Sequence, residues 1–457
     1  MRIRLWHALL ALLLAQLAGP VLADVAMRFT PDEVLVAFRP GTPAADKNAA
    51  HAQVAGHANR VVARIGVTVV SVPAGTTAAA LRSYRRNPNV LYAEPNYIRP
   101  LVLPTEGAFP GIPNVFDEQW NLHNTGAGIQ TYADPDTGAQ VYPMTRTDAD
   151  IDAPEAWDVS QGSPDVWVAV PDSGVACHHG DLVGKCIHEE DHVTPTVDSF
   201  GTPIPELVDR IGHGTHVAGT IAMATNNGDG AAGVGWNVSI GSFKVCYAEV
   251  VFGLVLGSNC EDADIASAIV AIADYGYHVI NMSFGGGPSA VVQSAVEYAA
   301  AQGVVLVAAA GNHGNWSKFY PAAYPDVLSV AATTPFDDRA HFSAFSVDDD
   351  FDASTSDDDW VDLLAPGSPI LSAAPPEACA PADPQCFQYM EGTSMASPHV
   401  SGVAGLVWSH LLATDPANAD RAEVRRRIQD CADTMGAMGQ DMRAWSRYGR
   451  LNAHGAL

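Results

Sequence analysis

Apolar runs that alternate with helical patterns predict an α/β domain with a largely parallel central sheet and helices on both faces, preceded by a small α+β domain. The continuous apolar runs are residues 166–170, 279–283, 304–308 and 327–331. Unbroken apolar strands are typical of a sheet that is covered on both sides. The segments with helical patterns between them are 213–224, 262–275 and 289–302. This alternation indicates parallel strands joined by helical crossovers.

Residues 1–23 have the pattern of a secretory signal peptide. Arg2 and Arg4 precede an apolar run at 5–18, and Val21-Leu22-Ala23 fits a cleavage site that takes small residues. A membrane-spanning helix needs about 20 apolar residues. This run is shorter, and Gly19-Pro20 follows it. We therefore expect a cleaved signal and a secreted protein rather than a retained anchor.

The remaining chain divides into three parts by composition. Residues 24–100 form a small domain, with strand patterns at 34–38, 67–72 and 90–93 and a helical pattern at 77–86. Residues 101–115 are rich in Pro and Gly, which predicts an exposed linker that is open to proteolysis. Residues 116–457 contain the α/β pattern and are long enough for one large core.

The charge is distributed unevenly. Residues 24–100 contain 9 Lys and Arg against 5 Asp and Glu, whereas the part from 101 onward contains 13 against 46. A strongly acidic body repels nucleic acids and anionic membranes, so neither is an expected partner. Opposite charges would also favour association of the small basic domain with the acidic body.

The chain has 7 cysteines, and disulfides persist in exported proteins. Proximity in sequence favours Cys177–Cys186, Cys246–Cys260 and Cys379–Cys386, although six cysteines allow 15 connectivities. Cys431 is left over, and we expect it to be buried and inert. The spacing is too loose for a zinc site.

Three short motifs carry the candidate chemistry, and each has a simpler explanation when taken alone. Asp172 ends an apolar strand in VAVPDSGV, but an Asp before Gly is commonly a turn residue. His213 starts a helix in GHGTHVAGTIA, where His213 and His216 could instead form a structural or metal-binding pair. The zinc signature HExxH is absent, however, since no Glu lies between them. Ser394 starts a helix in GTSMASPHVSGVAGL, where a Ser can simply cap the helix.

Together the three motifs resemble the subtilisin-like serine peptidases (subtilases) over residues 116–457. The order Asp, His, Ser is that of subtilisins, and GTSMA lacks the second Gly of the GxSxG elbow of esterases. The resemblance implies that Asp172 orients His213, that His213 takes the proton of Ser394, and that Ser394 forms an acyl-enzyme. It also implies that Asn312, in AAAGN, donates a hydrogen bond to the oxyanion.

The resemblance also implies a substrate cleft. Ser283, Phe284 and Gly285 of NMSFGGG would line one side, and Ala309, Ala310 and Gly311 the other, with an extended substrate bound by strand addition. Phe319 would lie near the cleft floor and make the pocket shallower than usual. Pro171 departs from the family pattern, and because it has no N–H we expect a local distortion of the strand.

A structural Ca²⁺ is a further implication of the resemblance, since TNNGDGAAG at 225–233 is similar to a calcium loop of the family. The implied ligands are the side chains of Asp181 and Asn227 and backbone carbonyls near Thr225, Asp229 and Ala231, with Asp117 or Gln119 as candidate N-terminal ligand. Calcium takes six to eight oxygens, which such a loop can supply.

Residues 24–100 resemble the family's propeptide, which implies a ferredoxin-like fold that templates and inhibits the catalytic domain. We therefore expect a monomeric, secreted serine endopeptidase that acts on extended polypeptides and processes itself, with 101–115 containing the maturation site. The alternatives are a catalytically inactive binding protein on the same fold and another serine acyl hydrolase, such as an esterase. Casein digestion combined with fluorophosphonate labelling separates the three.

Overall fold

The computed structural model describes residues 29–62, 67–97, 115–126, 132–133, 140–141, 145–193, 207–251, 254–346, 359–379 and 386–457. The predicted signal peptide, and the predicted linker apart from Val115, lie outside these ranges. The chain divides into two compact units, Met1–Leu101 and Val102–Leu457.

The first unit is a four-stranded antiparallel sheet with two helices, in the order β-α-β-β-α-β. Its elements are β1 (Phe29–Phe38), α2 (Ala44–Ala52), β2 (His57–Val62), β3 (Val67–Ser71), α3 (Thr77–Arg86) and β4 (Val90–Tyr97). The strand order β2-β3-β1-β4 is that of a ferredoxin-like fold, as predicted. Its core is small, with Val36 and Val70 of the sheet packed with Leu81 and Tyr84 of α3.

The second unit is built on an eight-stranded sheet in which every neighbouring pair of strands is parallel. The strand order is β18-β15-β14-β13-β12-β7-β9-β8. The bounds are β7 (Trp167–Asp172), β8 (Cys186–Asp191), β9 (Ser239–Lys244), β12 (Val279–Met282), β13 (Val305–Ala309), β14 (Val327–Thr333), β15 (Leu363–Pro366) and β18 (Gly449–Arg450). The four predicted strands of this domain are therefore neighbours at the centre of the sheet.

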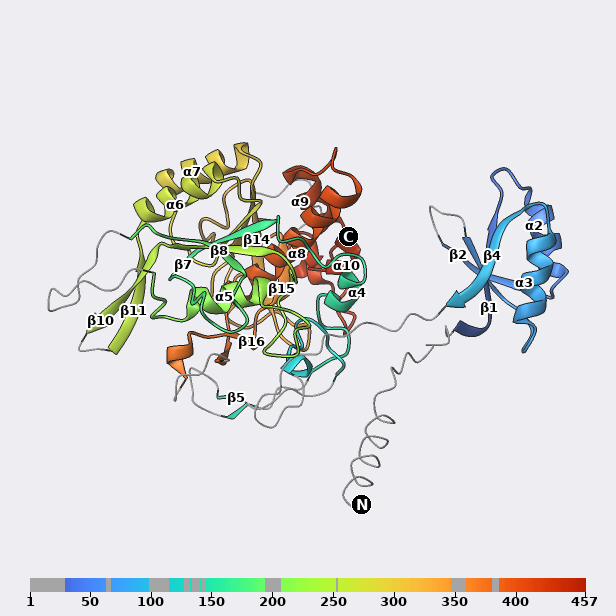
Figure 1. Cartoon of the computed structure of the whole chain (residues 1–457), viewed down its shortest axis with the longest axis horizontal. Helices are drawn as coiled ribbons and strands as arrows, with labels where there is room; N and C mark the ends of the chain where they lie inside the picture. Colours follow the sequence, from blue (N-terminus) through green and yellow to red (C-terminus); the bar gives the residue numbers. More distant parts are fainter. Residues whose placement is uncertain are drawn as a thin grey trace, which may run out of the picture. The chain divides into compact units, whose positions relative to one another are not determined.

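Helices cover both faces of the sheet (Figure 1). The helices are α4 (Ala153–Trp157), α5 (His213–Ala222), α6 (Asp262–Asp274), α7 (Ala290–Ala301), α8 (Thr393–Thr414), α9 (Arg421–Asp430) and α10 (Ala453–Ala456). Val168 and Val170 of β7 pack in the core with α5 and α8, whereas Ala169 packs with α6 and α7. Successive residues of a strand point to opposite faces, so an unbroken apolar strand serves both layers.

The remaining elements are short. They are the hairpins β5–β6 (Tyr132–Ala133, Gln140–Val141), β10–β11 (Cys246–Val251, Leu254–Cys260) and β16–β17 (Ile370–Ala373, Phe387–Met390), with the 3-10 turns Val115–Glu118, Pro376–Ala378 and Met442–Ala444. The three predicted disulfides are present. Cys431 is outside them, as predicted, but it is partly exposed rather than buried. Among the described helices, none is both long and apolar enough to cross a membrane.

Candidate active site

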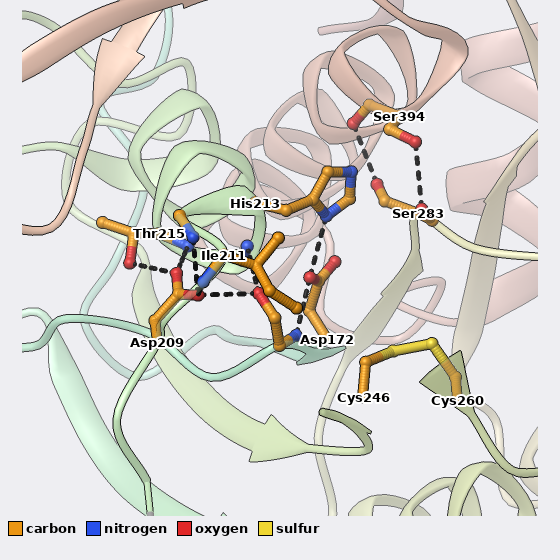
Figure 2. Close-up of polar contacts among 12 residues, drawn as sticks. Asp172, Asp209, Ile211, His213, Thr215, Cys246, Cys260, Ser283 and Ser394 are labelled. Atoms are coloured by element: carbon orange, nitrogen blue, oxygen red, sulfur yellow. Dashed lines mark hydrogen bonds and ion pairs between the residues drawn. A yellow bond between two sulfur atoms is a disulfide. The ribbon is translucent and has the colours of Figure 1, made fainter. Parts of the chain in front are cut away.

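The predicted catalytic residues meet at one edge of the sheet. Asp172 ends β7, Ser283 follows β12 and Asn312 follows β13, and these three strands are neighbours in the sheet. Parallel strands place their carboxyl ends at the same edge, which is where open α/β sheets bind ligands. His213 at the start of α5 and Ser394 in the first turn of α8 are brought to the same edge (Figure 2).

Asp172 and His213 form a direct hydrogen bond, in which the distance from Asp172 Oδ1 to His213 Nδ1 is 2.8 Å. Asp172 is only 3% exposed, and its Oδ1 also accepts a hydrogen bond from the Ser173 amide at 2.7 Å. A Cβ on Gly214 would clash with the carbonyl oxygen of Gly174, so glycine at 214 lets α5 approach the end of β7. The bond leaves Nε2 as the ring nitrogen available for proton transfer.

Asp209, which the motif analysis did not single out, holds the start of α5. Its Oδ1 accepts hydrogen bonds from the Gly212 amide at 2.8 Å and from Ser173 Oγ at 2.9 Å. Its Oδ2 accepts hydrogen bonds from the amide and the hydroxyl of Thr215 at 3.0 and 2.6 Å. An Asp shortly before an apolar helical run is a known N-terminal signal, so Asp209 could have been found in DRIGHGT. The network fixes both backbones that carry Asp172 and His213.

The carboxylates change the basicity of His213. Burial lowers the pKa of the imidazole, but the charge of Asp172, its hydrogen bond and the charge of Asp209 together raise the pKa above its ordinary value. An opposite charge nearby stabilises imidazolium, which is the form that arises when the ring accepts a proton. The arrangement therefore favours His213 as a general base.

Ser394 lies on the other side of the imidazole in Figure 2. Its hydroxyl donates a hydrogen bond to the Ser283 carbonyl oxygen at 3.0 Å, and the Ser283 hydroxyl in turn donates to the Ser394 carbonyl oxygen at 2.9 Å. Asn281 and Ser397 also contact the Ser283 hydroxyl, each at 2.9 Å. The first turn of α8 is thus anchored on the end of β12. The Ser394 hydroxyl itself is held by one carbonyl, which a rotation of its side chain can release.

Asn312 is oriented by Thr393, the residue before Ser394. Its Oδ1 accepts hydrogen bonds from the amide and from the hydroxyl of Thr393, both at 2.9 Å. These two bonds assign the oxygen end of the side-chain amide, so Nδ2 is turned away from Thr393. Gly392 has φ +154°, and a Cβ there would lie 3.3 Å from Asn312 Nδ2. Glycine at 392 thus keeps this side of the amide accessible.

The two predicted walls of the substrate cleft differ. Ser283, Phe284 and Gly285 line a cavity of about 650 Å³ together with Asp172 and His213. Ala309, Ala310 and Gly311 are buried, and they are not among the residues that line this cavity. The Phe319 ring lies against Gly285 and Gly311, between the two segments, and Phe319 is not among the residues that line this cavity.

His216 is a packed structural histidine. It is fully buried, and its Nε2 lies 3.0 Å from the Ile370 carbonyl oxygen and 3.2 Å from that of Gln388. Burial lowers its pKa to about 3, so it is neutral. Within the described part of the chain, no group of three or more His, Cys, Asp and Glu side chains could hold a metal ion.

One fully buried carboxylate, from the turn between β7 and β8, packs against the predicted calcium loop. Asp181 Oδ2 accepts a hydrogen bond from the Ala231 amide at 2.7 Å, and Asp181 Oδ1 lies 3.4 Å from Asn227 Nδ2. Burial raises the pKa of Asp181 to about 7. A cation with oxygen ligands would compensate this buried charge, but Asn227 turns its donor Nδ2 rather than its oxygen toward the carboxylate.

The side chains of Thr225, Asn227 and Gln119 form hydrogen bonds within or to the loop. Thr225 Oγ1 donates to loop carbonyls and accepts from the Gly233 amide, and Asn227 Oδ1 accepts from the Asp229 amide. Gln119 pairs through both ends of its amide with the backbone of Ala232, at 2.7 and 2.8 Å. Gln119 therefore secures this loop through its own hydrogen bonds.

Pro171 does not disturb β7 on the side of β9. The parallel register continues without a shift through Pro171, which faces Phe243, to Asp172, which faces Lys244. The predicted distortion is therefore wrong on this side, since the strand keeps its geometry up to the Asp172 carboxylate.

Comparisons with known proteins agree with this architecture. The model of the subtilase family matches residues 163–449, and that of the fervidolysin N-terminal prodomain matches residues 19–96. A thermophilic serine proteinase of Bacillus sp. (strain AK1) is 33% identical over 435 residues, which cover 94% of this chain and 88% of that protein. Thermitase of Thermoactinomyces vulgaris is 38% identical over 309 residues, or 67% of this chain and 93% of thermitase.

Among solved structures, sphericase superimposes with a TM-score of 0.52 at 30% identity, covering 64% of this chain and 92% of that one. The match to the family model spans more than half of the chain and includes Asp172, His213, Asn312 and Ser394. The chain belongs to the subtilase family of serine peptidases and carries an N-terminal prodomain.

Proposed function

We propose that this protein is a secreted endopeptidase that hydrolyses extended polypeptides through an acyl-enzyme on Ser394. The observation that carries the proposal is the 2.8 Å hydrogen bond that the buried Asp172 accepts from His213, with the Ser394 hydroxyl at the same edge of the sheet. A carboxylate, an imidazole and a helix-starting hydroxyl are the groups that acyl transfer from a peptide requires.

In the first half-reaction, the Ser394 hydroxyl leaves the Ser283 carbonyl and attacks the substrate carbonyl carbon. His213 Nε2 takes the hydroxyl proton while Asp172 stabilises the imidazolium. Asn312 Nδ2 and the Ser394 amide at the start of α8 donate to the oxyanion, where the helix dipole also favours negative charge. His213 then gives its proton to the leaving amine. In the second half-reaction, water repeats the attack and frees the acid.

We also propose that the precursor processes itself within 101–115 and that the N-terminal prodomain acts as template and inhibitor. The prodomain match and the ferredoxin-like fold of this unit support a role in the family's maturation. A signal peptide at 1–23 is proposed to direct secretion, and the mature enzyme is proposed to be a monomer.

A structural Ca²⁺ in the loop after α5 completes the proposal. The Asp181 carboxylate and the Asn227 side-chain oxygen would hold it, with backbone carbonyls near Thr225, Asp229 and Ala231. When bound, the ion would neutralise the buried Asp181 charge and rigidify the loop. It lies outside the reaction itself.

The test uses the secreted protein on casein, with a fluorophosphonate probe and mass spectrometry to locate the label. We expect casein digestion and a label confined to Ser394. Labelling without digestion of protein would favour an esterase, and the absence of both would favour an inactive binding protein on this fold.

A further inference from the structure

The aromatic ring of Phe319 fills the space between two segments that follow neighbouring strands. A Cβ added to Gly285, after β12, would lie 2.5 Å from Phe319 Cε1. A Cβ added to Gly311, after β13, would lie 3.0 Å from Phe319 Cδ1 and Cγ. The ring therefore touches the backbone of both segments. Any side chain at either glycine would collide with it.

The ring is fixed in place by its surroundings. The next residue, Tyr320, exchanges two backbone hydrogen bonds with Gly286, at 2.8 and 3.0 Å. The Phe319 carbonyl oxygen accepts a hydrogen bond from the Ala323 amide at 2.8 Å. The His313 ring lies against Phe319, with 5.1 Å between the ring centroids. The backbone that carries the ring is thus tied to Gly286 and Ala323, and the ring itself packs against His313.

The position of the ring matters because of where an acylating substrate has to lie. Its carbonyl carbon must reach Ser394 Oγ, which rests on Ser283. Its carbonyl oxygen must reach Asn312 Nδ2, and Asn312 directly follows Gly311. The residue that supplies this carbonyl is thus placed between the two segments, and its side chain must share the space that Phe319 occupies.

We propose that Phe319 is a specificity-determining residue, and that it restricts the substrate residue before the scissile bond to Gly, Ala or Ser. This inference rests on the proposed function. The neighbouring cavity of about 650 Å³ remains open, with Phe284, Val292 and Tyr320 in its wall. A larger side chain from elsewhere in the substrate fits there. Selectivity would then come from the side chains that precede the acylating residue rather than from that residue itself.

The test measures kcat/KM of the mature enzyme for the p-nitroanilides Ala-Ala-Pro-Ala and Ala-Ala-Pro-Phe. A pocket that excludes large side chains lowers kcat/KM for a bulky substrate by roughly tenfold or more relative to a small one. We therefore expect kcat/KM for the Ala substrate to exceed that for the Phe substrate by at least this factor. Phe319→Ala should raise the ratio of Phe to Ala turnover by roughly tenfold or more, because it vacates the space between Gly285 and Gly311. Phe319→Leu should give a smaller rise.

The matched control is Trp316→Ala, which removes an aromatic side chain that is 67% exposed on the same loop. It should leave the Phe to Ala ratio unchanged. An unchanged ratio in Phe319→Ala, or an equal change in Trp316→Ala, would overturn the role of Phe319.

A measurement on the unaltered enzyme covers the case in which the Phe319 variants fail to fold. Mass spectrometry of peptides released from an unfolded protein should show Gly, Ala or Ser before most cuts. A majority of Phe, Tyr or Leu at this position would overturn the inference while leaving the proposed function intact. If the enzyme cuts no peptide and takes no fluorophosphonate label, the proposed function fails, and this inference fails with it.

Discussion

The two sides of the candidate active site are held very differently. On the side of His213, Asp209 accepts hydrogen bonds from Ser173, Gly212 and Thr215, and Asp172 bonds the imidazole directly. On the other side, the Ser394 hydroxyl has one hydrogen bond, to the Ser283 carbonyl oxygen. His213, the proposed general base, is therefore positioned before substrate arrives. The Ser394 hydroxyl, the proposed nucleophile, has to rotate before it can transfer its proton.

Around Ser394, the backbone and the reactive hydroxyl differ in how firmly they are held. The backbone of the first turn of α8 is fixed by Ser283 and Asn312, while the Ser394 hydroxyl stays movable. A fixed backbone matters because we propose the Ser394 amide as an oxyanion donor, and preorganised donors need no rearrangement during the reaction. The movement that Ser394 needs is thus confined to rotation of its own side chain.

Removing the nucleophile should have the largest effect. Ser394→Ala is expected to lower kcat by roughly 10⁶-fold, the scale of loss known for a subtilisin without its catalytic Ser. Because maturation is proposed to be self-cleavage, the variant should accumulate as a precursor that has lost only its signal peptide. Casein assays and N-terminal sequencing measure both results. Ser409→Ala, on the same helix with its hydroxyl bonded to the Gly405 carbonyl oxygen, should mature normally. Maturation of Ser394→Ala without added enzyme would contradict self-processing.

Asn312→Ala tests the preorganised oxyanion donor and should have the next largest effect. Loss of one such donor lowers kcat by roughly 10²–10³-fold in a subtilisin, and KM should change little because the bond strengthens only in the transition state. Steady-state kinetics on a peptide anilide separate the two constants. Asn315→Ala, three residues along the same loop, provides the matched control and should stay near wild-type activity. A large rise in KM with kcat preserved would remove Asn312 from this role.

Much of this arrangement could be predicted from the sequence because its signals are local. The four central strands are buried on both faces, so they are unbroken apolar runs, and their ends carry Asp172, Ser283 and Asn312. Strand β8 escaped prediction because it is an edge strand with polar side chains, CIHEED, and pairs only with β9. Helix α2 was also missed, since it buries only Ala50 and His51 and has little periodicity.

The contacts between distant segments could not be predicted. Ser283 is expected from the sequence to line the substrate cleft, and its hydroxyl has the further role of anchoring α8 through Ser394 and Ser397. That role depends on which face of α8 meets the end of β12, and this follows from packing of the whole domain. Asp209 is the opposite case, because an Asp shortly before the apolar helical run of α5 is a signal that the sequence itself contains.

Removing a negative charge near His213 should change activity less than the two substitutions above. His213 must be neutral to accept the Ser394 proton, so activity falls as pH drops through its pKa, which Asp172 and Asp209 raise above the ordinary value. Asp209→Asn removes one negative charge and should move the acid limb of kcat/KM to lower pH. A pH series from 5 to 9 measures this limb. Asp165→Asn, an exposed carboxylate elsewhere, should leave the limb in place. A variant that loses activity equally at every pH would make Asp209 purely structural.

The calcium loop should contribute to stability and leave the reaction unchanged. An ion at about 100 times its Kd adds about 2.7 kcal/mol, so chelation should lower Tm by roughly 5 °C. Asp181 has its pKa raised to about 7 by burial, so without metal its contribution to stability falls as pH rises from about 4 to about 7. Ca²⁺ binds the ionised form, so its stabilising effect should grow over the same window. Differential scanning fluorimetry with and without chelator, at pH 5 and 8, measures both.

Two variants decide whether Asp181 is the ligand. Asp181→Asn should abolish the response to chelator, because an amide leaves no carboxylate for the cation. Asp229→Asn should keep the response to chelator, since residue 229 is proposed to bind the ion only through its backbone carbonyl. An Asn side chain can also still accept the hydrogen bond that the Gly230 amide donates to Asp229 Oδ1 at 3.1 Å. Equal loss of the response in both variants would place the ion elsewhere in the loop. An unchanged Tm in the unaltered protein on chelation would mean that hydrogen bonds from Ala231 and Asn227 alone hold the buried carboxylate.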